Sequence, residues 1–184
     1  DGNSLRPAIV WLDQRRAEVK GHLPGLWKWL FKLIGVEDVV NRFREKSQAA
    51  WITQNQADVW KKTHKYLLLS GYLSFKLTGE FKDSIESQVG YIPFDYKKRA
   101  WANDSDWRYS VAPELKRSML PDLVEPGEKL GELTKQAAEH IGLSEGLQVI
   151  ASASDKACEI LGSGGNRPDI ACMSYGTTAT INTT

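Results

Sequence analysis

The sequence has 184 residues, of which 41% are hydrophobic and 26% are charged, and its formal net charge is +1. These values are ordinary for a soluble globular domain with a sizeable core. A balanced charge provides no basic field for nucleic acid, so no nucleic-acid partner is expected. No segment approaches the roughly 20 consecutive apolar residues that span a membrane, so no membrane partner is expected either.

The N-terminal region contains a short apolar run, residues 8–12, that is followed at once by the polar residues 13–16. This pattern predicts a buried strand that presents polar side chains at its carboxyl end. Asp13 and Arg15 are the polar residues of interest there, because a carboxylate and a guanidinium at a strand end can contact a ligand.

The next region, residues 17–77, is predicted to be mostly helical. Apolar residues recur at helical spacing from Val59 to Leu77. We expect Asp58 to cap this helix and Gly79 to end it. Most of the aromatic and leucine side chains are expected to form core.

Residues 82–124 are predicted to be irregular and are rich in Tyr and Trp. Packing of a loop-rich layer is the commoner use of such residues, and stacking on a sugar is the alternative.

The C-terminal third has a different pattern. Thr134 is expected to cap a helix over residues 135–141 that stops at Gly142. Residues 147–151, 169–174 and 179–182 are strand-like, and a helical stretch over residues 156–161 follows the first of them. This order predicts an α/β core with a large, mainly helical insertion, which we assign to residues 17–125.

Two places in this third are candidates for a chemical role. Asp155 lies where a strand gives way to a helix, an edge at which α/β proteins bind ligands, although helix capping is the commoner role of such an Asp. Gly176 and Thr177 form a turn between strands, where a flexible backbone and a hydroxyl can approach a phosphate. No GxxxxGK[ST] motif is present, and the glycines at 162–165 do not make a dinucleotide fingerprint.

Four stretches in this order resemble the FGGY family of carbohydrate kinases. They are the WxDxR strand of residues 5–15, the LTG segment of residues 72–79 with Asp83 and Ser84, the approach to an acidic residue over 131–155, and the turn of residues 174–178. The resemblance implies a partial RNase H-like (actin-like ATPase) domain. It also implies an enzyme that transfers phosphate from ATP to a sugar or polyol.

The family resemblance also implies roles for particular residues. Asp155 corresponds to the general base and a ligand of Mg²⁺. Gly176, Thr177 and Thr178 correspond to the residues that bind the ATP phosphates, and Asp13, Arg15 and Lys156 lie on the substrate side. ATP and Mg²⁺ are the expected cofactors, and a homodimer is possible.

The chain also departs from the family pattern. Lys156 follows the acidic residue where the family commonly has an amide, so this lysine faces solvent, contacts an acidic or phosphorylated group, or pairs with Glu159. Nothing in residues 1–184 matches the family's first phosphate loop or its C-terminal domain. We therefore expect these residues to be an incomplete N-terminal domain.

We expect a carbohydrate kinase as the gene product and no turnover by these residues alone. The alternative is a non-catalytic sugar-binding or interaction fragment with a degenerate site. Because central strands of the family's sheet have no counterpart here, we also expect imperfect folding, pairing with another copy, or re-paired strands.

Overall fold

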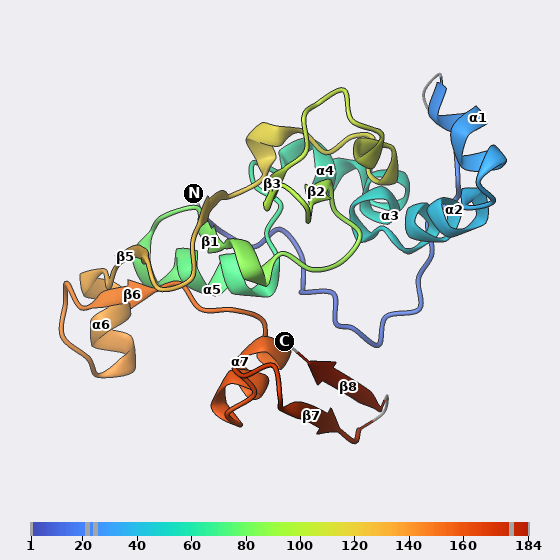
Figure 1. Cartoon of the computed structure of the whole chain (residues 1–184). Helices are drawn as coiled ribbons and strands as arrows, with labels where there is room; N and C mark the ends of the chain where they lie inside the picture. The colour runs from blue at the N-terminus through green and yellow to red at the C-terminus, as the bar shows by residue number, and fades with distance from the viewer. Residues whose placement is uncertain (1, 21–22, 24–25, 177–178, 184) are drawn as a thin grey trace.

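The computed structural model describes residues 2–20, 23, 26–176 and 179–183. It is a mixed α/β structure (Figure 1). The α-helices are α1 (Leu26–Leu33), α2 (Glu37–Lys46), α3 (Gln48–Asn55), α4 (Ala57–Lys62), α5 (Leu69–Thr78), α6 (Lys135–Ile141) and α7 (Asp155–Gly162). The strands are β1 (Lys82–Ser84), β2 (Phe94–Asp95), β3 (Ala100–Trp101), β4 (Asp122–Val124), β5 (Lys129–Glu132), β6 (Gln148–Ile150), β7 (Ala171–Ser174) and β8 (Thr180–Thr183). Short 3₁₀ turns cover Ile85–Ser87, Trp107–Val111 and Arg117–Met119.

The helices that follow the N-terminal segment pack on the irregular region, residues 82–124, as Figure 1 shows for α2 to α4. Ser47 separates α2 from α3 and caps α3, because its Oγ accepts a hydrogen bond from the Ala50 amide at 3.3 Å. The main core lies here and consists of Ala49, Ala112, Leu115, Met119 and Leu120, flanked by Trp60, Tyr66 and Trp101. Most of the aromatics in this region therefore pack, as expected from their number.

The prediction of a helix that ends at Gly79 is confirmed in part, by α5. It ends at Gly79, whose φ of 77° is left-handed and suits glycine. The continuous helix expected from Val59 to Leu77 is wrong, and so is the cap at Asp58, because α4 has Gln56 at its N-cap position. The chain between the helices is extended because the Tyr66 amide donates to the Met119 carbonyl at 2.8 Å, a tertiary bond that competes with helix formation.

Strands pair in twos among the described residues, as β1–β4, β2–β3, β5–β6 and β7–β8. The β1–β4 pair is parallel and the others are antiparallel. The strand expected at residues 8–12 is wrong: this segment is irregular, and Trp11 and Leu12 are 80% and 61% exposed. A strand forms only where a neighbour satisfies its backbone groups, and no strand of the described chain pairs with this run.

The C-terminal predictions are confirmed more closely. Thr134 caps α6 through a bond from the Ala137 amide, and Gly142 ends the helix with φ 74°. Strand β6 lies within residues 147–151, and β7 and β8 form a hairpin beside α7 (Figure 1). Strand β6 pairs with β5 rather than with the hairpin, so these strands do not share a single sheet in the described part of the chain.

No helix of the described residues is both long and apolar enough to cross a membrane. Cys158 and Cys172 are free thiols. The extent of the insertion over residues 17–125 and the assignment of residues 1–184 to an incomplete domain stay predictions.

Candidate functional site

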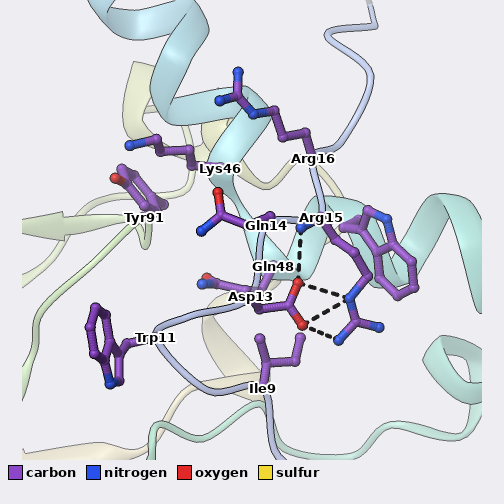
Figure 2. A pocket seen from close by; sticks show the side chains of 10 residues that line it. Ile9, Trp11, Asp13, Gln14, Arg15, Arg16, Lys46, Gln48 and Tyr91 are labelled. Atoms are coloured by element: carbon purple, nitrogen blue, oxygen red, sulfur yellow. Dashed lines mark hydrogen bonds and ion pairs between the residues drawn. The ribbon is translucent and has the colours of Figure 1, made fainter.

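A small pocket lies against the N-terminal segment and encloses about 160 Å³. Figure 2 shows the side chains around it. We call it the Asp13 pocket, and its lining residues are Ile9, Trp11, Asp13, Gln14, Arg15, Arg16, Lys46, Gln48, Trp51 and Tyr91. Two of the predicted site residues, Asp13 and Arg15, are therefore part of one hollow, together with polar and aromatic side chains from α2, α3 and the irregular region.

Asp13 and Arg15 bind each other. Both Asp13 oxygens accept from Arg15 Nε at 2.9 Å, and Oδ2 also accepts from Nη2. The Arg15 backbone amide donates to Oδ1 as well, at 2.9 Å. Arg15 further lies 4.3 Å from the centre of the Trp51 ring, a cation–π contact that holds the guanidinium in place. The pair is thus a fixed part of the pocket wall.

This pair gives a pH-dependent prediction. The hydrogen bonds from the Arg15 side chain and backbone lower the pKa of Asp13 from 3.8 to about 2. The contribution of Asp13 to stability is therefore present above pH 3.8 and is lost as the pH falls through about 2. In an NMR titration of the Asp13 carboxyl carbon we expect a midpoint near 2, moving toward 3.8 in Arg15→Met. A midpoint near 3.8 in the unchanged protein would contradict the pairing.

Asp155 is the first residue of α7. The N-cap position belongs to Ser154, so the capping alternative for Asp155 is not what the structure shows. Asp155 is exposed, and its Oδ1 accepts from the Lys156 amide at 2.6 Å. Its Oδ2 has no hydrogen-bond partner among the described residues. A carboxylate in the first turn is stabilised by the helix dipole and here keeps one oxygen available.

Lys156 has two hydrogen-bond partners. One of them is Glu159, so the structure shows the pairing that was one of the alternatives for this lysine. Its Nζ donates to Glu159 Oε2 at 2.5 Å and to Ser174 Oγ at 3.2 Å. The Glu159 carboxylate, as the main cause, raises the pKa of Lys156, so the ammonium stays charged. The bond to Ser174 links the start of α7 to the end of β7, directly before the turn that contains Gly176.

Strands β7 and β8 form an antiparallel hairpin around the segment predicted to bind phosphate. Ser174 pairs with Thr180 at the end of the hairpin, and Gly176 lies in the bend between them. A Cβ added at Gly176 would meet no atom of the described residues within 4 Å. The predicted phosphate contacts Thr177 and Thr178 lie outside the described residues.

The predicted site residues that the structure describes therefore fall into two separate groups. Asp155, Lys156 and Gly176 are connected through Lys156 and Ser174, whereas Asp13 and Arg15 belong to the Asp13 pocket, which none of those three lines. Sequence reasoning missed Lys46, Gln48 and Trp51 as pocket residues. They lie more than thirty residues from Asp13 in the chain, and no local pattern marks them.

The described structure is mixed α/β, with Asp155 at the start of α7 and Gly176 in the bend after β7. The model of the FGGY family of carbohydrate kinases, N-terminal domain, matches residues 1–162. The chain therefore belongs to this family, as its motifs predicted.

Individual relatives agree with the family. The chain is 43% identical over 108 residues, 59% of its length, to an uncharacterized sugar kinase, YgcE, of Escherichia coli (strain K12), and covers 22% of that protein. It is 27% identical over 165 residues, 89% of its length, to a xylulose kinase of Staphylococcus xylosus, and covers 33% of it. The chain thus spans a third or less of these relatives.

A solved structure shows the same fold. The Plasmodium falciparum glycerol kinase with ADP matches 98% of this chain with a TM-score of 0.70 and 17% identity, and the match covers 35% of that kinase. The two chains therefore share a fold over nearly the whole length of this chain.

Proposed function

We propose that this chain provides the general base, the second phosphate turn and part of the sugar site of an ATP-dependent carbohydrate kinase. The observation that carries the proposal is the connection between Asp155 and the Gly176 turn through Lys156 and Ser174. A phosphoryl transfer needs an acceptor-activating group and a phosphate-binding backbone close together, and these residues supply both types of group.

In the proposed reaction, the free oxygen of Asp155 accepts the proton of the attacking sugar or polyol hydroxyl. The transition state of phosphoryl transfer is loose, so orientation of the hydroxyl contributes more than basicity. The Lys156 ammonium, held by Glu159 and Ser174, fixes the start of α7 relative to the turn. Gly176, with Thr177 and Thr178, is proposed to receive the ATP phosphates.

Mg²⁺ is proposed to bind together with ATP. The described residues contain no group of three or more His, Cys, Asp or Glu that could hold a metal alone. This fits Mg²⁺, which takes one or two carboxylates and completes its shell with phosphate oxygens and water. Asp155 is the proposed carboxylate, and the ion would neutralise charge on the phosphates when bound.

The Asp13 pocket is the proposed place for the sugar. The Gln48 side-chain amide has no hydrogen-bond partner among the described residues, and Trp11 is largely exposed at the pocket wall. Amides and aromatic faces are the groups that bind hydroxyls and apolar sugar faces. We further propose a cytoplasmic location, in keeping with the exposed Cys158 thiol. A homodimer stays a prediction.

The test is an ADP-release assay with a panel of ketoses, aldoses and polyols, applied to this chain and to any longer product of the same gene. We expect sugar-dependent release from the longer product, and none from the 184 residues alone. Asp155→Asn should lower the rate by roughly 10²- to 10⁴-fold, the usual contribution of a general base.

Asp58→Asn is the matched control, because its side chain is 95% exposed on α4 and outside both groups of site residues. This variant should keep the full rate. A longer product that melts cooperatively and binds ATP, yet releases no ADP with any sugar, would contradict the kinase and favour a binding-only protein.

A further inference from the structure

The Asp13 pocket carries an unbalanced charge. Of the cations that line it, Arg15 is paired with Asp13, and Arg16 lies 3.5 Å from Glu45 Oε2. Lys46 has no carboxylate within 4.0 Å among the described residues, and its Nζ lies over Tyr91, 5.9 Å from the ring centre. Lys46 is therefore the positive charge of this pocket that no carboxylate of the described chain offsets.

The neighbours of Lys46 are suited to a hydroxylated ligand. In Figure 2, Lys46 and Tyr91 lie at one side, and Gln14 and Gln48 project into the space between them and Asp13. The Gln48 amide has no partner in the described chain, so its donors and its acceptor are both free. Neutral hydroxyls can use these groups, but they leave the Lys46 charge uncompensated.

We propose that the Asp13 pocket prefers a sugar acid, a polyhydroxylated chain with a carboxylate, and that Lys46 is the residue that determines this preference. The inference rests on the proposed function and names its substrate class. A ligand carboxylate would form a charge-assisted hydrogen bond to the Lys46 ammonium, about twice as strong as a neutral one. The hydroxyls would bind Gln14 and Gln48, and Trp11 would cover an apolar face.

The test compares gluconate with glucitol, which have the same carbon chain and differ at one end by a carboxylate. Binding to the 184-residue chain is measured by isothermal titration without ATP. We expect gluconate to bind roughly five- to tenfold more tightly at low salt. The preference should be smaller at high salt, because Lys46 is exposed to solvent and salt screens exposed charges.

Lys46→Gln should remove the preference and leave glucitol binding unchanged. The control Lys61→Gln removes a lysine of α4 that does not line the pocket, and it should keep the preference. Equal affinity for the two ligands, a preference that survives Lys46→Gln, or no binding of either ligand by folded protein each overturns the proposal.

The outcome is separable from that of the kinase proposal. Selective gluconate binding by this chain, with no ADP release by a folded longer product of the same gene, would leave the pocket assignment standing and count against the kinase. Release of ADP with neutral sugars only, lost in Asp155→Asn, would support the kinase and refute the preference for sugar acids.

Discussion

Asp83→Ala is expected to lower the free energy of unfolding by about 3 kcal/mol, because it leaves several buried donors without an acceptor. The Asp83 side chain is 1% exposed. Its Oδ2 accepts from Ser70 Oγ and from Gln88 Nε2, both at 2.8 Å, and its Oδ1 accepts from the Ser84 amide at 2.8 Å. The Asp83 carboxylate also accepts a hydrogen bond from the backbone amide of Gly71.

These bonds explain how α5 begins. Leu68 occupies its N-cap position and offers no side-chain bond, so Asp83 of β1 supplies the acceptor from a distant part of the chain. Thermal unfolding of Asp83→Ala should show a midpoint lower by roughly 6–12 °C for a chain of this length. Asp122→Ala is the control, because Asp122 pairs with Lys82 in the same β1–β4 ladder and its side chain is 79% exposed.

The effect of Asp83→Ala should also depend on pH. Burial is the main influence on Asp83 and raises its pKa, while its hydrogen bonds oppose the shift in part. The contribution of Asp83 is therefore fully present below the unfolded value of 3.8 and falls as the pH rises through the folded value. The stability difference between the variant and the unchanged chain should be larger at pH 4 than at pH 7. Equal stability of the two proteins at both pH values would show that Asp83 does not hold α5.

Gly131→Ala is expected to lower the free energy of unfolding by about 1–3 kcal/mol, because it introduces a clash between β5 and the end of α5. A Cβ on Gly131 would lie 2.7 Å from Thr78 Cβ and 2.9 Å from its Cγ2. Thr78 cannot turn aside without loss, since its Oγ1 donates to the Ser74 carbonyl at 2.8 Å and accepts from the Glu80 amide at 3.1 Å.

Gly162→Ala is the matched control for this substitution. Gly162 ends α7, and a Cβ there would meet no atom of the described chain within 4 Å. Because alanine favours a helix over glycine by up to about 1 kcal/mol, this variant should be as stable as the unchanged chain or more so. Urea unfolding of both variants measures the difference. If the two behaved alike, the close approach of β5 to α5 would be refuted.

Local signals in the sequence were sufficient for the C-terminal helices and for the family. Thr134 and Gly142 bound α6 because capping depends on atoms within a few residues of the helix end. The hairpin around Gly176 and the helix beginning at Asp155 followed from short strand and turn patterns. The family assignment followed from motifs whose order is a property of the sequence alone.

Pairings between distant residues were not predictable in this way. The run at residues 8–12 has strand composition but no strand partner, so Trp11 lies exposed at a pocket instead of in a sheet. The helix expected through Tyr66 is interrupted because Tyr66 bonds to Met119, fifty-three residues later.

The sequence by itself determined which residues can cap, turn and act as acid or base, because these properties depend on residue type and near neighbours. Only the tertiary structure decided that Lys156 joins Ser174, that Asp83 holds α5, and that Lys46 lines a pocket with Asp13. Each of these depends on the approach of segments far apart in the chain. Local propensity carries no information about that approach, because burial and backbone pairing of the whole fold determine it.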